Sequence, residues 1–378
     1  MRDPILLTPG PLTTSLATKV AMLGDRGSWD AEFDALTAGV CARLAAVVDA
    51  GPEFACVPLQ GSGTYAVEAA VGTLVPRDGK LLVLANGAYG QRLAKLTRIL
   101  GRNLSVLDFG ETRPVHPERV AAALAQDPDV THVGIVHCET STGMRNPLEE
   151  VAEVVQAAGR RLIVDAMSSF GVLPLSARDL AFDAVVASAN KALEGVPGMA
   201  FVLARKEALL AARGNSHSLA LDLRDQYVYL QETGRWRFTP PTHVVAALAA
   251  ALDQFQAEGG QPGRLARYQA NCDRLLAGLL RLGLMPFLAR ELQAPVIVTV
   301  CAPDHPRYAF PELYARTRAA GFILYPGKLT SLETFRVGCI GAIGAAEIDA
   351  ALAAIDRALD AMGVLKAAPA PQPLGGRS

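Results

Sequence analysis

The stretch from Val185 to Phe201, VVASANKALEGVPGMAF, decides the fold. It begins with the apolar run Val185-Val186-Ala187, which is typical of a buried strand. The run ends in Ser188-Ala189-Asn190, and a single lysine, Lys191, follows before a glycine-rich turn. A lysine ammonium is strongly hydrated, so its place at the end of a buried strand needs a reason.

Runs of the same kind recur along the chain and alternate with amphipathic helical patterns. The seven runs are FACVPLQ (54–60), KLLVLAN (80–86), NLSVLDF (103–109), HVGIVHC (132–138), RLIVDAM (161–167), FDAVVAS (182–188) and GMAFVLA (198–204). This alternation predicts an α/β domain with a doubly wound, mostly parallel sheet of seven strands. The last run follows its neighbour too closely for a helical crossover, so we expect it to be antiparallel.

The pattern changes after about residue 260. A long helix leads to short strands near 295–301, 322–327 and 333–339 and then to a final helix, which predicts a smaller C-terminal α+β domain. We predict an N-terminal arm over 1–20, a large domain over 21–258, a small domain over 259–366 and a Pro/Gly-rich disordered tail over 367–378.

Composition excludes several classes of partner. The chain of 378 residues has a formal net charge of −1, so no basic field favours nucleic acid or an anionic membrane. Its six cysteines are scattered without metal-ligand spacing, so we expect no metal site and no disulfide framework. The N-terminus lacks a signal-peptide core, and no apolar run is long enough to span a bilayer, so we expect a cytoplasmic protein.

In open α/β sheets, ligands bind beyond the carboxyl ends of the strands, and polar residues gather there in this sequence. Residues 60–65, QGSGTY, follow the first run and enter a helical pattern. Their glycines and the helix N-terminus suit a phosphate, although a plain turn with a helix cap is the commoner meaning. Tyr89 follows the second run and could stack on a planar ring or pack on a neighbouring helix.

Three further runs end in polar groups. The fourth leads into HCETSTG (137–143), and the fifth ends in Asp165, a carboxylate that is costly to bury unless paired but that could cap a helix. The sixth ends near Lys191, and a lone lysine at such a place is usually a surface residue with its ammonium in water. Polar features at five strand ends favour one shared site over five separate explanations.

One chemistry uses all of these groups. Pyridoxal 5'-phosphate needs a lysine amine for its aldehyde, an acid against its pyridine nitrogen, a phosphate cradle and a ring that stacks on it. Asp165 would keep the nitrogen protonated so that the ring withdraws electrons, and Lys191 would act as the base that moves a proton. The sequence therefore predicts an enzyme that depends on pyridoxal phosphate.

The chain resembles the class V aminotransferases, which are fold-type I pyridoxal phosphate enzymes. The matching segments are LLTPGPLTTS (6–15), LQGSGTYAVEA (59–69), NGAYG (86–90), VHCETSTGMRNP (136–147), IVDAMSSFG (163–171), SANKALEGVPG (188–198), WRFTPPTH (236–243), ILYPGK (323–328) and FRVGCIG (335–341). They cover the chain from about residue 6 to 360. IVDAMSSFG, WRFTPPTH and ILYPGK are more specific to members that act on an aminophosphonate.

The resemblance implies a role for each matching residue. Lys191 and Asp165 would be catalytic, Lys191 through the bond to the cofactor's aldehyde and Asp165 through the pyridine nitrogen. The other residues implied at the cofactor are Ser62, Gly63, Thr64 and Asn190 at the phosphate, Thr239 at the phosphate from a neighbouring subunit, Tyr89 on the ring, Thr140 near the ring oxygen, and Met167. Arg336 would pair bidentately with the substrate carboxylate, with a surface ion pair as the plainer alternative.

The resemblance further implies a homodimer with shared active sites. Its ping-pong reaction would move the amino group of 2-aminoethylphosphonate to pyruvate, giving phosphonoacetaldehyde and L-alanine in phosphonate breakdown. A phosphonate carries more charge and more acceptor oxygens than a carboxylate, so it should recruit further donors. We expect these to be Arg26 and Ser28, with His217 next, although Arg26 could be an ordinary surface charge.

Other functions share this scaffold. Alanine–glyoxylate or serine–pyruvate transamination is the nearest alternative. A pyridoxal phosphate lyase such as a desulfurase would need a mobile catalytic cysteine, and no cysteine stands in an obvious flexible loop. A non-enzymatic binding module is disfavoured because Lys191 and Asp165 are both present.

Overall fold

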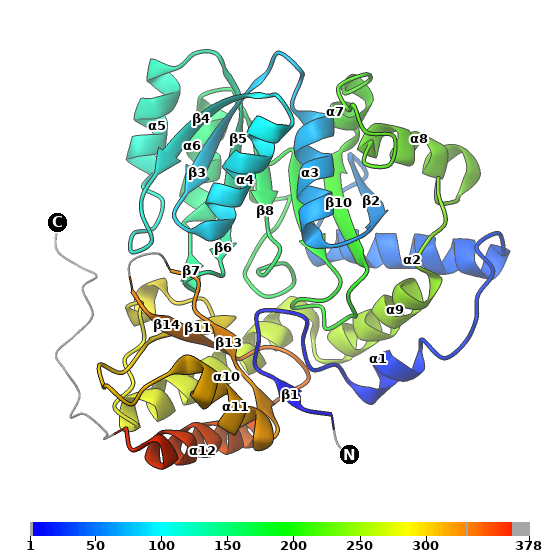
Figure 1. Ribbon diagram of the computed structural model, residues 1–378. Helices are drawn as coiled ribbons and strands as arrows, with labels where there is room; N and C mark the ends of the chain where they lie inside the picture. The colour runs from blue at the N-terminus through cyan, green and yellow to red at the C-terminus, as the bar shows by residue number, and fades with distance from the viewer. Residues whose placement is uncertain (1–2, 330–331, 365–378) are drawn as a thin grey trace.

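A seven-stranded sheet with the order β2-β10-β9-β8-β5-β3-β4 forms the centre of the computed structural model, which describes residues 3–329 and 332–364 (Figure 1). Strand β10 is antiparallel to both of its neighbours, and the other pairings are parallel. The strands are β2 (Phe54–Gln60), β3 (Lys80–Ala85), β4 (Asn103–Asp108), β5 (Val130–Val136), β8 (Arg161–Asp165), β9 (Ala184–Ser188) and β10 (Met199–Arg205). The prediction of a mostly parallel α/β sheet with an antiparallel last strand is confirmed.

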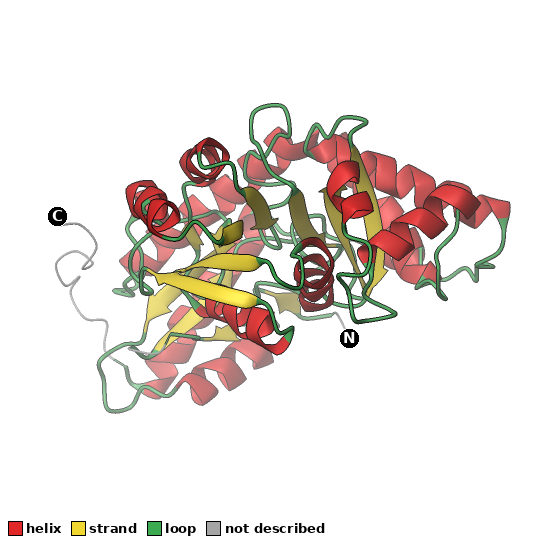
Figure 2. Ribbon diagram, turned by 90° about the horizontal axis from the view of Figure 1, so that it is seen from above, coloured by secondary structure: helices red, strands yellow, loops and turns green. Residues whose placement is uncertain are grey.

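Helices cover both faces of this sheet (Figure 2). Because successive strand residues point to opposite faces, Leu84 and Val164 pack with one helical layer, and Val83 and Ile163 pack with the other. The first layer holds α2 (Ala31–Val47), α5 (Pro117–Gln126), α6 (Leu148–Ala157) and α9 (Thr242–Ala257). The second holds α3 (Gly63–Leu74), α4 (Ala88–Ile99), α7 (Lys206–Ala211) and α8 (Leu223–Thr233). Because helices cover both faces of the sheet, the side chains on both faces of each strand are buried, and the strand sequences are continuous apolar runs.

The C-terminal part has the expected α+β form. Its antiparallel sheet has the order β11-β14-β13, with β11 (Ile297–Cys301), β13 (Tyr325–Pro326) and β14 (Thr334–Gly338). Side chains of the sheet share one apolar core with side chains of the helices. These helices are α10 (Gly260–Arg281), α11 (Phe310–Ala319) and α12 (Ala345–Met362), and a short 3₁₀ helix, η1 (Arg290–Leu292), precedes β11.

The start of the chain touches both parts. Strand β1 (Ile5–Leu6) pairs in parallel with β12 (Phe322–Ile323), and Leu7 is buried in the C-terminal core. Helix α1 (Leu16–Val20) packs against α9. The predicted domain boundaries at residues 20, 258 and 366 stay a prediction, and the tail predicted over 367–378 lies outside the described residues.

Two kinds of feature are absent from residues 3–329 and 332–364, the described part of the chain. None of its helices combines the length and the apolar character needed to cross a membrane. Nor do its His, Cys, Asp and Glu side chains form a group of three that could hold a metal ion.

Candidate active site

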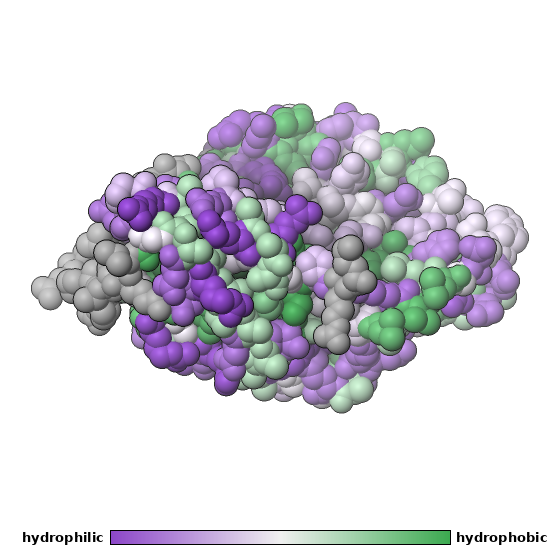
Figure 3. Space-filling model, turned by 60° about the horizontal axis from the view of Figure 1, so that its bottom comes forward, coloured by the Kyte–Doolittle hydropathy of each residue, from purple (hydrophilic) through white to green (hydrophobic). Residues whose placement is uncertain are grey.

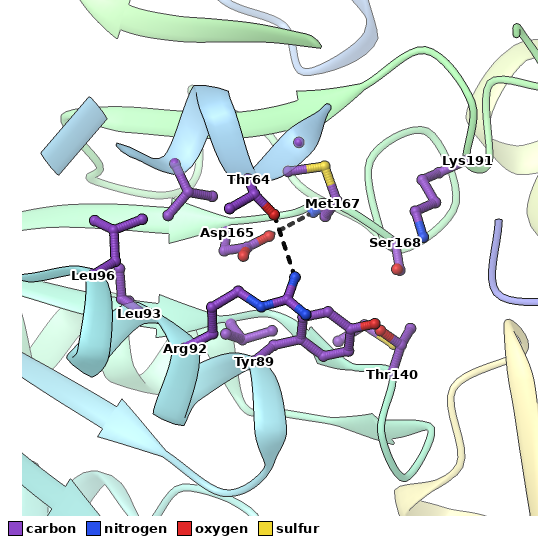
Figure 4. Close-up of a pocket in the computed structure, with 14 residues that line it drawn as sticks. Thr64, Tyr89, Arg92, Leu93, Leu96, Thr140, Asp165, Met167, Ser168 and Lys191 are labelled. Carbon is purple, nitrogen blue, oxygen red and sulfur yellow. Dashed lines mark hydrogen bonds between the residues drawn. The ribbon is translucent and has the colours of Figure 1, made fainter. Parts of the chain in front are cut away.

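A pocket lies at the carboxyl ends of the central strands (Figure 4). It brings together seven of the predicted site residues, which come from five separate strand ends. They are Gly63, Thr64, Tyr89, Thr140, Asp165, Met167 and Lys191. The remaining lining residues include Arg92, Cys138 and Ser168. Because the carboxyl ends of parallel strands lie at the same edge of the sheet, residues that are far apart in the sequence are close together in this pocket.

The turn between β2 and α3 forms one wall of the pocket. Gly61 has φ +129°, a conformation that favours glycine, and a Cβ at Gly63 would collide with the sulfur of Met167. Ser62 is the N-cap of α3, yet its side chain makes no capping hydrogen bond. The Ser62 hydroxyl and the first N–H groups of α3 therefore suit an anion such as the cofactor's phosphate.

Asp165 ends β8, between Val136 of β5 and Val186 of β9. Its Oδ1 accepts the N–H of Met167 at 3.0 Å, and no cationic side chain among the described residues forms a salt bridge with it. Burial raises the pKa of Asp165 to about 6, with a further upward contribution from Glu139. The chain after Asp165 forms turns rather than a helix, so the carboxylate caps no helix. A protonated pyridine nitrogen would supply the cationic partner that such a group needs.

Lys191 follows β9 and lines the pocket, at the end away from Leu93 and Leu96 (Figure 4). Burial lowers the pKa of its ammonium to about 8, although the charge of Asp165 acts in the opposite direction. An amine whose pKa is near 8 loses its proton far more readily than a surface lysine. Lys191 is therefore suited to act as a nucleophile toward an aldehyde and later as a base.

The N-terminal segment TPGP (8–11) lies against this lysine. Nζ of Lys191 donates a hydrogen bond to the carbonyl oxygen of Pro9 at 2.6 Å. Gly10 has φ +119°, and a Cβ there would come within 2.6 Å of Cδ of Lys191. The segment LLTPGPLTTS contributed to the resemblance, but no pattern in it pointed to this contact.

Glu139 fixes the position of Tyr89. Its buried carboxylate accepts the N–H groups of Tyr89 at 3.1 Å and Gly90 at 3.2 Å, at the start of α4. It also accepts the N–H of Ser141 at 3.2 Å. A carboxylate is favourable at a helix N-terminus, so this cap holds the Tyr89 ring in the pocket wall. The polar cluster HCETSTG signalled a site, but the role of Glu139 was not predicted.

Arg336, in β14, borders the pocket from the C-terminal part. Its side chain is buried, and it donates to the carbonyl oxygens of Pro326 and Thr140, each at 2.9 Å. Within the described residues it forms no salt bridge, so the alternative of a surface ion pair does not describe its surroundings. The two carbonyls hold the guanidinium beside Thr140, and its remaining N–H groups suit a carboxylate.

Two cations near Tyr89 were missed by the sequence analysis. The guanidinium carbon of Arg92 lies 4.8 Å from the centre of the Tyr89 ring, and Nη1 donates to the Thr64 hydroxyl at 3.3 Å. Nζ of Lys328 lies 4.3 Å from the same ring centre. Arg92 could have been predicted from the sequence, because it lies three residues after Tyr89 in α4 and residues three apart share one face of a helix. Lys328 belongs to the ILYPGK motif, but nothing in the sequence points it at Tyr89.

The other predicted residues are not among those that line this pocket. Asn190 directly precedes Lys191, while Thr239 is exposed between α8 and α9. Arg26 pairs with Glu32 at 3.3 Å, and Ser28 is exposed in the turn before α2. His217 is also exposed, in the loop before α8. The binding roles of all these residues stay predictions.

Comparisons with known proteins agree in family and fold. Residues 28–311 match the family Aminotransferase class-V. The chain is 61% identical over 362 residues to a 2-aminoethylphosphonate–pyruvate transaminase of Pseudomonas entomophila (strain L48), which covers 96% of this chain and 98% of the relative.

Two solved structures share the fold over nearly the whole chain. Pyridoxamine-pyruvate aminotransferase from Mesorhizobium loti has a TM-score of 0.88 at 25% identity, covering 97% of this chain and 95% of its own. Alanine–glyoxylate aminotransferase from Nostoc sp. has a TM-score of 0.88 at 26% identity, covering 95% of this chain and 96% of its own.

Proposed function

This chain belongs to the class V aminotransferases, and from that premise we propose that it transfers the amino group of 2-aminoethylphosphonate to pyruvate with pyridoxal phosphate as cofactor. The products are phosphonoacetaldehyde and L-alanine. The observation that carries the proposal is the meeting of Lys191, Asp165 and the N-terminus of α3 in one pocket. The reaction is the one for which the relative with 61% identity is named.

The residues present fit the cofactor. When bound, pyridoxal phosphate supplies an aldehyde that takes up the amino group and a ring that withdraws electrons. Ser62, Gly63 and Thr64 would hold its phosphate, and Asp165 would hold the proton on its ring nitrogen. Tyr89, fixed by Glu139, would stack on the ring.

Lys191 has two tasks in this proposal. With a pKa of about 8 its amine is partly neutral near neutral pH, so it can attack an aldehyde. With the substrate bound, the same amine would take a proton from the substrate carbon that bears the nitrogen. The carbonyl oxygen of Pro9 accepts a hydrogen bond from this amine at 2.6 Å and so helps to orient it.

Arg336 would bind the carboxylate of pyruvate in the second half of the reaction. The carbonyls of Pro326 and Thr140 orient its guanidinium, so little conformational freedom is lost when a planar carboxylate binds. Burial lowers the pKa of Arg336 from its usual value, but arginine stays protonated at neutral pH.

A homodimer with shared sites is part of the proposal. Leu16 and Leu23 are 76% and 81% exposed, and Trp29 and Phe238 are exposed as well. Hydrophobic residues show on the surface at the lower right of Figure 3, on the side where Figure 1 draws α1. Large exposed apolar side chains that gather on one side favour a contact between copies. Thr239, next to Phe238, would then reach the partner's phosphate cradle.

Sedimentation tests the dimer. We expect a dimer. The substitution Thr239→Ala should weaken the binding of the cofactor but leave the dimer intact. A monomer that holds the cofactor tightly would contradict the shared site. The cytoplasmic location stays a prediction.

The two alternatives make different demands on the site. Alanine–glyoxylate or serine–pyruvate transamination needs the same lysine and aspartate, so only the choice of donor separates it. A desulfurase-type lyase needs a reactive thiol. Cys138 is the cysteine that lines the pocket, and burial raises the pKa of its thiol well above the usual value, which disfavours the thiolate.

Half-reaction spectroscopy tests the proposal. Candidate amines are added singly to the holoenzyme, and the cofactor's change from its aldehyde to its amine form is followed by absorbance. We expect 2-aminoethylphosphonate to convert the cofactor much faster than serine. A faster reaction of serine, followed by turnover with glyoxylate, would favour the alternative transaminase.

A further inference from the structure

The two substrates place their anions differently. In alanine and pyruvate the carboxylate is attached to the carbon that carries the nitrogen or the oxo group. In 2-aminoethylphosphonate the phosphonate lies one carbon farther away, and near neutral pH it carries more negative charge than a carboxylate. If the proposed function holds, on which this inference rests, one arginine at a fixed position cannot meet both anions equally well.

Arg336 is held at a fixed position. Its Nε donates a hydrogen bond to the carbonyl oxygen of Pro326, and its Nη1 donates one to the carbonyl oxygen of Thr140. The guanidinium carbon of Arg336 lies 5.0 Å from the centre of the Tyr325 ring. The side chain is buried in the β14 strand, so it cannot follow an anion that moves outward by one carbon. A second donor is needed for the larger and more distant group.

Lys328 is placed to be that donor. Strand β13 pairs with β14 so that Tyr325 stands opposite Arg336, and the chain leaves β13 through Gly327. The N–H of Gly327 donates to the carbonyl oxygen of Thr334 at 3.0 Å, and a Cβ at Gly327 would collide with Thr334. This close approach directs the next residue, Lys328, to the Tyr89 ring, where its Nζ lies 4.3 Å from the ring centre.

Like charges gather around Tyr89, and the Glu139 carboxylate offsets them only in part, because it raises the pKa of Lys328 less than burial and the two arginines lower it. Burial lowers the pKa of Lys328, and the positive charges of Arg92 and Arg336 lower it further. Within the described ranges no carboxylate forms a salt bridge with any of these three side chains. Glu139 is near, but its oxygens accept N–H groups at the start of α4. Cations that repel one another at a pocket edge are typical of a site for a polyvalent anion.

The other cations suit this task less well. Arg92 bonds to Thr64 on the side of the phosphate cradle, which suits the cofactor's own phosphate. Arg26, predicted from the sequence, pairs with Glu32 outside this pocket. We propose that Lys328 binds the phosphonate of the amine donor, and that Arg336 without Lys328 suffices for the carboxylate of alanine and pyruvate. Lys328 is then a specificity-determining residue of the site.

The test compares two amines on one variant. The holoenzyme and its Lys328→Met variant are mixed in single turnovers with 2-aminoethylphosphonate or with L-alanine, which runs the second half-reaction backward. Loss of a charge-assisted contact should reduce the rate constant divided by Kd about 10-fold or more for the phosphonate. Alanine should react within about twofold of wild type, which also shows that the variant is folded. Lys328→Arg should restore most of the phosphonate reaction.

Lys95→Met is the matched control, because it removes the same charge from an exposed position on α4. It should leave both half-reactions unchanged. Equal losses for both amines in Lys328→Met, or no loss for the phosphonate, would overturn the inference, and Lys328→Gln repeats the comparison with a polar side chain. If wild type reacts with alanine but not with 2-aminoethylphosphonate, the proposed function itself is wrong and the inference falls with it.

Discussion

Nζ of Lys191 lies 2.6 Å from the carbonyl oxygen of Pro9, although the two residues are 182 positions apart in the chain. The N-terminal segment therefore covers the lysine that we assign to catalysis. Leu7 is buried in the apolar core of the C-terminal part, and Leu12 is buried in a second apolar cluster that includes Cys138 of the pocket wall. The segment is thus anchored on both sides of its contact with Lys191.

Gly10 makes this contact possible, so Gly10→Ala should disturb the site. Its φ of +119° is strained for alanine, and the added Cβ would come within 2.6 Å of the Lys191 side chain. We expect a loss of about 1–3 kcal/mol in unfolding free energy and weaker retention of the cofactor, measured by thermal unfolding and by absorbance. Gly24→Ala is the control, because nothing lies within 4 Å of a Cβ there. If Gly10→Ala and Gly24→Ala have the same unfolding free energy and retain the cofactor equally well, Gly10 does not form the close contact with Lys191.

Asp165→Asn should impair turnover far more than cofactor binding. A neutral amide does not stabilise a proton on the pyridine nitrogen as a carboxylate does. The ring should therefore withdraw electrons less well. Loss of one preorganised electrostatic contact reduces kcat roughly 100- to 1,000-fold. Steady-state rates and the dissociation constant of the cofactor measure the two effects separately. Turnover near that of wild type would show that Asp165 has no part in the reaction.

The ammonium of Lys191 should make the stability of the apoprotein depend on pH. Burial lowers its pKa from 10.5 to about 8, so between these values the unfolded chain binds the proton while the folded chain has released it. The unfolding free energy of wild type should therefore rise with pH from 8 to 10.5, relative to Lys191→Met. Below this window the difference between the two proteins should be constant. Denaturant unfolding of both apoproteins across this range measures it, and parallel curves throughout would contradict the burial of the amine.

Glu194 should stabilise the turn that follows Lys191. Its buried carboxylate accepts the Tyr268 hydroxyl at 2.5 Å and a guanidinium N–H of Arg267 at 2.6 Å, both from α10. Its φ of +60° is unusual for a residue other than glycine. Removing one partner of a buried ion pair costs about 3–5 kcal/mol, so Glu194→Gln should lower the unfolding free energy by this amount.

The pair Arg274 and Asp349 offers a control for Glu194, because it also joins two helices but is exposed. Asp349→Asn should cost less than about 1 kcal/mol. Urea unfolding of the two variants compares them. A loss for Glu194→Gln as small as that for Asp349→Asn would show that the buried network contributes little.

The sheet and much of the pocket could be predicted because they depend on local patterns. Apolar runs indicate the strands, and the residues that follow Gln60, Ala85, Val164 and Ser188 had to meet at one edge once these strands were parallel. Strand ends were less certain. HVGIVHC was expected to continue to residue 138, but β5 ends at residue 136, and a short pairing of β6 (Cys138–Glu139) with β7 (Met144–Arg145) follows.

The contacts between distant segments could not be predicted. Arg336 bonds to the carbonyl of Thr140 across 196 positions, and this depends on how the C-terminal sheet packs on the pocket. The approach of Lys328 to Tyr89 depends on the same packing. Such contacts follow from tertiary structure and leave no periodic signal in the sequence.

The most direct measurement of the central claim is a single turnover of the holoenzyme with 2-aminoethylphosphonate alone, followed by addition of pyruvate. We expect 2-aminoethylphosphonate to convert the cofactor to its amine form with release of phosphonoacetaldehyde, and pyruvate then to restore the aldehyde form with one equivalent of L-alanine. Lys191→Ala should do neither. A wild-type enzyme whose cofactor is unchanged by the phosphonate but converted by serine would contradict the account.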